Sequence, residues 1–184
     1  MKKCLFLSGF IVSFSLCFSQ EITPPPAGKA VVYFARVSQL GFAINFSYFD
    51  STQLIAKFNG SGYFRYECEP GQHVFWARSE NRSFVEANLD SGKIYFIEAV
   101  PTMGGLKAAV DLTPINPATA EKRMAKILKL IGKQAAEDLP ADDLAAEAKR
   151  MEDVVKRGWE KYQNDKANKE NFPQLTADMN YVAR

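Results

Sequence analysis

The sequence predicts a mainly β protein, an antiparallel β-sandwich of about eight strands with a C-terminal two-helix extension. Three observations lead to this fold class. Short runs rich in aromatic and β-branched residues recur between residues 30 and 115, and several alternate apolar with polar residues. Turn-forming residues separate these runs, and no helix-length segment lies between them, which argues against a parallel α/β sheet. After Pro114 the apolar residues recur at helical spacing instead.

The stretch 59–80 is the expected centre of the domain and is predicted to be a β-hairpin. Pro70 presets φ at the first central position of its turn, and Gly71 accepts the positive φ that a type II turn needs at the second. Residues that favour a pleated, half-buried surface lie on both sides of the turn, namely Tyr63, Phe64, Tyr66, Val74, Phe75 and Trp76.

The remaining strands are expected before and after this hairpin. Residues 40–50 place Phe42, Ile44, Phe46 and Tyr48 at alternate positions, which is the period of a strand with one buried face. The other strands are predicted at 30–37, 53–58, 82–89, 93–100 and 106–112, so the sandwich domain spans residues 30–115.

Two helices are predicted in residues 116–164. Asn116 is the expected cap of the first helix, with Pro117 in its first turn. Its apolar stripe consists of Ala120, Met124, Ile127, Leu128 and Ile131. Pro140 precedes the second helix, whose stripe consists of Leu144, Ala148, Met151, Val155, Trp159 and Tyr162. A short loop between the helices predicts an αα-hairpin, and the polar residues 165–184 are expected to form a flexible tail.

The N-terminus has the features of a secretory signal peptide at 1–19. Two lysines precede an apolar run of about 15 residues, shorter than a membrane-spanning helix needs, and we place cleavage after Ser19. A lipid on Cys17 would require a small residue before it, but Leu16 stands there, so membrane association through this cysteine is not expected. The proline-rich segment 20–29 would be a spacer. The sequence therefore predicts an exported protein that is periplasmic, in the outer envelope or extracellular.

Charge and cysteine content exclude some functions. Removal of the signal takes Lys and Arg from 23 to 21, against 21 Asp and Glu, so the mature chain is formally neutral. With no basic stripe expected, nucleic-acid binding is not predicted. Cys68 is then the one remaining cysteine, so no intramolecular disulfide can form, and its place on a strand face predicts a buried small hydrophobe.

Several short motifs resemble a known family. The first strand reads VVYFAR and ends in Arg36, residues 70–73 read PGQH, residues 77–80 read ARSE, and residues 91–96 read SGKIYF. Residues 62–64 and the break at 104–106 read GYF and GGL. In these motifs, residues 30–127 resemble the exported bacterial domain-of-unknown-function family numbered 2846. The resemblance implies a small exported β-sandwich, often lipid-anchored, with no catalytic residues to carry over. The second predicted helix is an addition to the family's pattern.

The sequence does not predict an enzyme. His73 is the sole histidine, and no cluster of Cys, His, Asp and Glu has the spacing of metal ligands, so neither a metal nor another cofactor is expected. A small hydrolase centred on His73 is the weakest of the alternatives, because a histidine directly after a Pro-Gly turn is expected to cap the turn or pack near its edge.

The function predicted is that of an exported, non-enzymatic envelope protein of interaction or structural type. The stripe of Met151, Val155, Trp159 and Tyr162 would contact a partner protein or a second copy of the chain, or it would pack within the molecule. The alternative is a glycan- or peptidoglycan-binding module that uses an exposed aromatic residue of the central hairpin, Trp76 or Tyr63. Phe75 and Trp76 must point to opposite faces of the sheet, and we expect the helices to cover the outer one.

Overall fold

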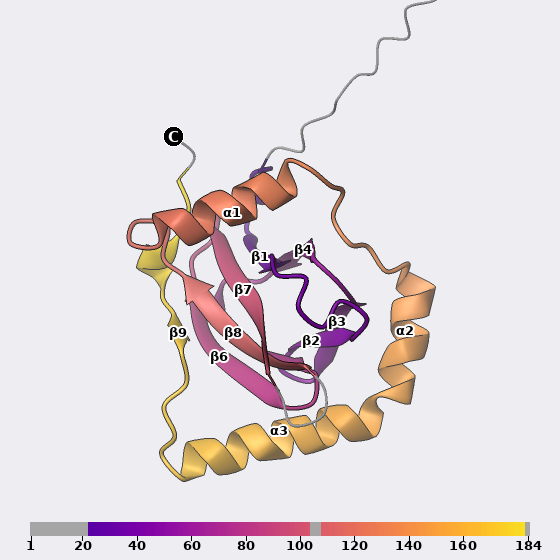
Figure 1. The fold of residues 1–184 in the computed structure, drawn as a ribbon. Coiled ribbons are helices and arrows are strands. Elements are labelled where there is room, and N and C mark those ends of the chain that lie inside the picture. The colour runs from indigo at the N-terminus through magenta and orange to yellow at the C-terminus, as the bar shows by residue number, and fades with distance from the viewer. Residues whose placement is uncertain (1–21, 104–107, 183–184) are drawn as a thin grey trace, which may run out of the picture.

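The computed structural model describes residues 22–103 and 108–182. The predicted signal peptide with Cys17 and the glycine break at 104–106 lie outside the described residues. Nine strands in the described part form two sheets, which pack face to face (Figure 1). Sheet A has the order β4-β1-β7-β8, formed by Gly62–Cys68, Ala30–Arg36, Ile94–Met103 and Ala108–Ile115. Sheet B has the order β3-β2-β5-β6-β9, formed by Gln53–Phe58, Phe46–Asp50, Gly71–Arg78, Arg82–Leu89 and Gln174–Leu175.

The predicted β-sandwich with C-terminal helices is confirmed, although both sheets are mixed rather than wholly antiparallel. β1 pairs in parallel with β7, where Val31 faces Ile94, and β6 pairs in parallel with β9. β1 lies between β4 and β7, which run in opposite directions. One neighbour of β1 must therefore be parallel to it.

The predicted central hairpin is wrong. β4 and β5 belong to different sheets, because the chain crosses from sheet A to sheet B at Glu69 and Pro70. β1 is buried at each of its seven positions, so its backbone groups need partners on both edges, and β4 supplies one edge over the whole length of β1. The positive φ expected at Gly71 is confirmed at 118°.

The strand predicted at 40–50 is also too long, since β2 begins at Phe46. The preceding loop is organised by Arg36, whose guanidinium is fully buried. It donates hydrogen bonds to the carbonyl oxygens of Leu40, Gly41 and Ile44 at 2.8, 2.8 and 2.9 Å. These bonds hold the backbone in a loop, and Phe42 remains 67% exposed despite its alternating position.

The main core lies between the two sheets. Phe34 of β1 stacks on Phe64 of β4 at 4.8 Å and meets Phe75 of β5 edge-on at 5.3 Å. The predicted burial of Cys68 in this core is confirmed, with 6% of the residue exposed. Burial raises the pKa of its thiol to about 12, so the reactive thiolate is scarce at neutral pH.

The three α-helices among the described residues cover both outer faces of the sandwich, so the predicted αα-hairpin is wrong (Figure 1). α1, Glu121–Ile131, packs its apolar face on sheet A, whereas α2, Ala141–Arg150, and α3, Glu152–Ala167, cover sheet B. Each sheet has an apolar outer face, and one hairpin could cover just one of them. α1 also begins later than predicted, because Asn116 accepts a hydrogen bond from the N–H of Ala118 within a turn that precedes the helix.

The tail was predicted to be flexible, but the segment 168–182 packs against the domain. Leu175 is fully buried, and β9 pairs with β6. The Tyr181 N–H donates to the Ile94 carbonyl at 2.7 Å, and its ring meets Phe96 at 5.5 Å. Single apolar residues are enough to hold this polar segment in place, because Leu175 is buried in the main core and Tyr181 packs against the core beneath α1. No helix in the described residues is long and apolar enough to cross a membrane.

Candidate functional site

The outer face of sheet B carries an apolar row across its middle. Phe49 is paired with both Leu54 and Trp76, and Trp76 is paired with Phe84. Directly paired residues point to the same face of a sheet, so the four side chains form one continuous row. Phe49 stacks on Trp76 with ring centroids 3.8 Å apart. A row of this kind must be covered, and the α2–α3 pair covers it.

α3 approaches this row most closely at Gly158. A Cβ atom at this position would lie 2.3 Å from Cη2 of Trp76, so no larger residue fits there without movement. Trp76 is itself fixed, because its indole N–H donates to the carbonyl oxygen of Ser51 at 2.7 Å. The helix therefore lies closest to the sheet at Gly158, while Val155 and Tyr162 also pack on the apolar row. Two hollows lie beside this contact.

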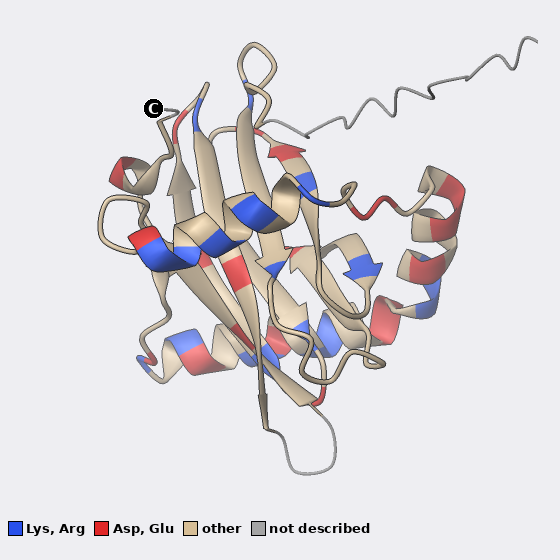
Figure 2. Ribbon diagram, turned by 45° about the horizontal axis from the view of Figure 1, so that its top comes forward, with Lys and Arg blue, Asp and Glu red and all other residues tan. Residues whose placement is uncertain are grey.

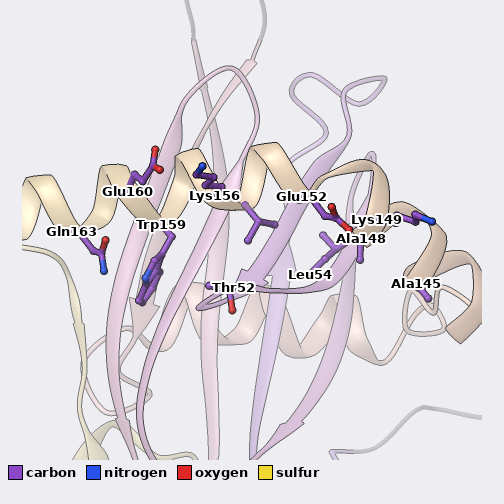
Figure 3. A pocket seen from close by; sticks show the side chains of 11 residues that line it. Thr52, Leu54, Ala145, Ala148, Lys149, Glu152, Lys156, Trp159, Glu160 and Gln163 are labelled. Atoms are coloured by element: carbon purple, nitrogen blue, oxygen red, sulfur yellow. The ribbon is translucent and has the colours of Figure 1, made fainter.

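The larger hollow, which we call the α3 cleft, has a volume of 870 Å³. It lies between α2, α3 and the turn from β2 to β3 (Figure 3). Its walls are apolar and its edges polar, as shown by the lining residues Thr52, Leu54, Ala148, Val155, Trp159 and Gln163. The size and lining are those of a site for a small molecule or for a short part of a chain.

Trp159 forms one wall of the α3 cleft. Its side chain projects from α3 toward the sheet and is partly exposed (Figure 3). One side of the ring is supported by Tyr162, with ring centroids 5.1 Å apart and planes inclined by 30°. The indole N–H has no hydrogen-bond partner among residues 22–103 and 108–182. A rigid aromatic wall with an unused donor is thus available to a ligand.

The rim of the α3 cleft is charged but balanced. Lys149 and Lys156 alternate with Glu152 and Glu160 along the exposed edge of the helices. Figure 2 shows the same mixture of both charges on α2 and α3, in contrast to α1, where Lys and Arg predominate. Opposite charges in alternation leave little net field, so the cleft does not select a strongly charged ligand.

A smaller hollow of 490 Å³ lies on the other side of Trp159. Glu86 stands in it and accepts hydrogen bonds from Tyr162 at 2.7 Å, Lys166 at 2.5 Å and Gln174 at 2.8 Å. Burial opposes ionisation of Glu86, but these three donors lower its pKa below the ordinary value. The carboxylate thereby joins β6, α3 and β9, and its bonding capacity is occupied by structural contacts.

His73 lines the same hollow but is poorly placed to act as a base. Its Nδ1 lies 2.8 Å from Asp50 Oδ2, and its Nε2 lies 2.8 Å from the carbonyl oxygen of Glu69. Both neighbours are acceptors, so both ring nitrogens must carry protons to satisfy them. The hydrogen bond to Asp50 is the main cause of a raised His73 pKa. As predicted, the residue caps the turn.

Both residues predicted to bind a ligand are buried. Trp76 is 0% and Tyr63 is 2% exposed, so neither offers a face to a sugar ring and this part of the glycan hypothesis is wrong. The expectation that the helices cover the outer member of the Phe75–Trp76 pair is confirmed. The reason is Gly158, which lets α3 lie directly on the indole.

The predicted partner-binding stripe divides into buried and accessible residues. Met151 is 6% exposed and packs in the core beneath the helices, so it cannot contact a partner. Val155 and Trp159 line the α3 cleft, whereas Tyr162 faces the smaller hollow. The opposite wall, with Thr52 and Leu54, was not predicted, because only the strand pairing brings it beneath α3.

No group of three or more His, Cys, Asp or Glu within the described ranges is arranged to hold a metal ion. A scan against models of known protein families finds no match to this chain, and a search of curated proteins finds no similar protein. Membership of family 2846 therefore stays a prediction. The function of the chain must therefore be inferred from the geometry of the α3 cleft.

Proposed function

We propose that this chain is an exported, non-enzymatic binding module, and that the α3 cleft receives a neutral sugar ring of an envelope or extracellular glycan. The observation that carries this proposal is the partly exposed indole of Trp159, held against Tyr162 and facing an open cleft of 870 Å³. One face of a pyranose ring presents C–H groups, which stack on an aromatic wall. Its hydroxyl groups point outward, where they can reach polar side chains.

The cleft supplies such polar groups around the indole. Thr52 and Gln163 line it together with Trp159, and Figure 3 shows the hydroxyl of Thr52 and the amide of Gln163 on the same side of α3 as the indole. These side chains offer both donors and acceptors, as sugar hydroxyls require. The alternating charges of the rim favour a neutral ligand over an anionic or cationic one.

A peptide helix is a less suitable occupant of this cleft. Helix-in-groove binding uses several large apolar anchors spaced along the groove, and here the large apolar side chains are Leu54, Val155 and Trp159 alone. The small residues Ala145 and Ala148 form the rest of the apolar wall. The cleft therefore suits one ring better than a row of side chains.

Hydrolysis of a bound glycan is disfavoured by the positions of the acids. Glu152 and Glu160 both line the cleft but are eight residues apart on α3, which separates their backbone positions by about 12 Å along the helix axis. Paired catalytic carboxyl groups in glycosidases lie roughly 5–9.5 Å apart. His73 already uses both ring nitrogens for the turn. These distances support binding without catalysis.

The test uses the two tryptophans as separate reporters. Trp76 is fully buried, so quenching of fluorescence by acrylamide reports mainly on Trp159. Addition of a neutral polysaccharide, such as a glucan or a mannan, should protect Trp159 from quenching. Trp159→Ala should weaken retention on the same polysaccharide at least about tenfold, while the circular dichroism spectrum stays unchanged.

Phe42→Ala is the matched control, because it also truncates an exposed aromatic residue but lies outside the cleft. It should bind like the unmodified protein. Equal retention of Trp159→Ala and the unmodified protein would overturn the proposal. So would the absence of retention on every neutral glycan, combined with a Trp159-dependent complex with an apolar peptide, which would assign the cleft to a protein partner.

A further inference from the structure

A row of polar residues crosses the outer face of sheet B, beside the apolar row. Ser47 of β2 is paired with Lys57 of β3 on one side and with Arg78 of β5 on the other, and Arg78 is paired with Arg82 of β6. Paired residues share a face, so three cations and one hydroxyl stand side by side across four strands. We call these four residues the cation row.

The junction of α2 and α3 lies over the cation row and encloses a hollow of 370 Å³. Lys57, Ser47 and Arg78 line it from the sheet, and Arg150 lines it from the end of α2. Asn45 and Ser79 add further polar side chains to the wall. The hollow therefore collects several donors from two layers of the molecule.

Negative charge in the hollow does not balance these cations. Glu147 is the acidic residue that lines it, and it is shared between Lys57 at 2.5 Å and Arg150 at 3.2 Å. Arg78 forms no ion pair with any residue in the ranges 22–103 and 108–182. Its cross-strand neighbour is another arginine, Arg82, and like charges in direct opposition destabilise a sheet. The fold thus retains an arrangement that costs stability.

Ser47 lines the hollow and is 4% exposed. One buried polar group of the cation row also lacks a partner within the described residues. The Nε of Arg82 is buried without a hydrogen-bond partner. Burial, together with the like charges of Arg78 and Arg157, lowers the pKa of Arg82. Glu80 lies in the turn between Arg78 and Arg82 and has an interaction partner.

Three cations, Lys57, Arg78 and Arg150, line the hollow, and Glu147 is the acidic residue beside them, so the hollow suits an anion. We propose that the hollow beneath the α2–α3 junction binds a tetrahedral oxyanion, the phosphate group of a phosphomonoester, through Arg78, Arg150, Lys57 and the hydroxyl of Ser47. Guanidinium groups match the oxygens of such an anion in paired hydrogen bonds. The volume of 370 Å³ exceeds that of a bare phosphate and leaves room for the attached group. This site is distinct from the α3 cleft and does not depend on its function.

The test measures binding of inorganic phosphate and of glucose 6-phosphate to the mature chain by isothermal titration calorimetry at low ionic strength. Both should bind saturably, the ester more tightly than the free ion. Arg78→Gln should weaken both at least about tenfold. In phosphate-free buffer the same variant should be no less stable than the unmodified protein, because it removes the repulsion between Arg78 and Arg82. If Arg78 had a purely structural role, Arg78→Gln would instead lower the free energy of unfolding in phosphate-free buffer.

Lys126→Gln is the matched control, since it removes one positive charge from the exposed face of α1, on the opposite side of the sandwich. It should change phosphate affinity less than about twofold. An equal loss of affinity in Lys126→Gln and Arg78→Gln would overturn the proposal in favour of diffuse attraction by surface charge. The absence of saturable phosphate binding by the unmodified protein would overturn it as well. Neither result bears on retention by neutral glycans through Trp159.

Discussion

Gly158→Ala gives the sharpest test of how α3 is held on the sheet. In an unobstructed helix this change stabilises a protein by about 1 kcal/mol, because glycine has a poor helix propensity. Here the new methyl group would lie 2.3 Å from Cη2 of Trp76 and 2.8 Å from its Cζ2 and Cζ3. Phe49 stacks on Trp76, and the Ser51 carbonyl holds its N–H, so the indole cannot easily turn aside.

The expected magnitude follows from these opposing effects. Overpacking a core by a methyl group costs about 1–3 kcal/mol, and three contacts below 3 Å belong at the upper end of that range. After subtraction of the propensity gain, Gly158→Ala should lower the free energy of unfolding by about 1–2 kcal/mol. Urea unfolding followed by circular dichroism measures this difference.

Two further variants test whether contact with Trp76 is the cause of the destabilisation. Gly132→Ala changes an exposed glycine with φ of −71°, which alanine adopts freely, so it should be neutral or stabilising by up to about 1 kcal/mol. Trp76→Phe removes the fused benzene ring that the new methyl group would meet. In that background, Gly158→Ala should cost at least about 1 kcal/mol less than in the unmodified protein. If Gly158→Ala stabilises the protein in both backgrounds, α3 does not rest on Trp76.

Two other predictions concern the polar contacts around the smaller hollow. The folded-state pKa of His73 is raised above 6.5 by its hydrogen bond to Asp50, so its stabilising effect is complete below that pH and is lost as the pH rises through the folded-state pKa. The free energy of unfolding of the unmodified protein should therefore fall more steeply from mildly acidic to mildly alkaline pH than that of His73→Gln, and parallel curves would contradict the role given to this pair. Glu86→Gln should lower the free energy of unfolding by about 1 kcal/mol near neutral pH, since it removes the charge that Lys166 and Tyr162 contact. The variant should also expose residues 168–182 to proteases, and unchanged cleavage there would show that Glu86 does not hold the C-terminal segment.

The positions of most strands could be predicted from the sequence, because the residue types within each strand indicate which of its positions are buried. The run 53–58 and the run 82–89 coincide with β3 and β6. Pairing could not be predicted in the same way. β4 and β5 are adjacent along the chain and joined by a turn, yet β1 takes β4 as its partner. That choice depends on the whole length of β1 being buried, which no local pattern near the turn reveals.

The candidate sites were less predictable than the strands for a related reason. Both tryptophans are aromatic residues in apolar stretches. The sequence favoured covering of the outer residue of the Phe75–Trp76 pair by the helices and left open whether Trp159 binds a partner or packs within the molecule. A single glycine on another element, Gly158, decides that Trp76 is covered and Trp159 is not. The cation row combines Lys57, Arg78 and Arg82 from three strands, and each looks like an ordinary charge at a strand end until the register is known.

Both proposed sites owe their existence to the break between α2 and α3 at Met151. As one straight helix, residues 141–167 would be about 40 Å long, whereas five strands at about 4.8 Å spacing span only about 20 Å. α3 alone, at about 24 Å, matches that width, and the break lets α2 turn along the edge formed by β3 (Figure 1). Buried Met151 anchors the corner, with Arg150 directed to the cation row on one side and Val155 to the α3 cleft on the other. A straight helix could cover the apolar row, but it would not present both surfaces at once.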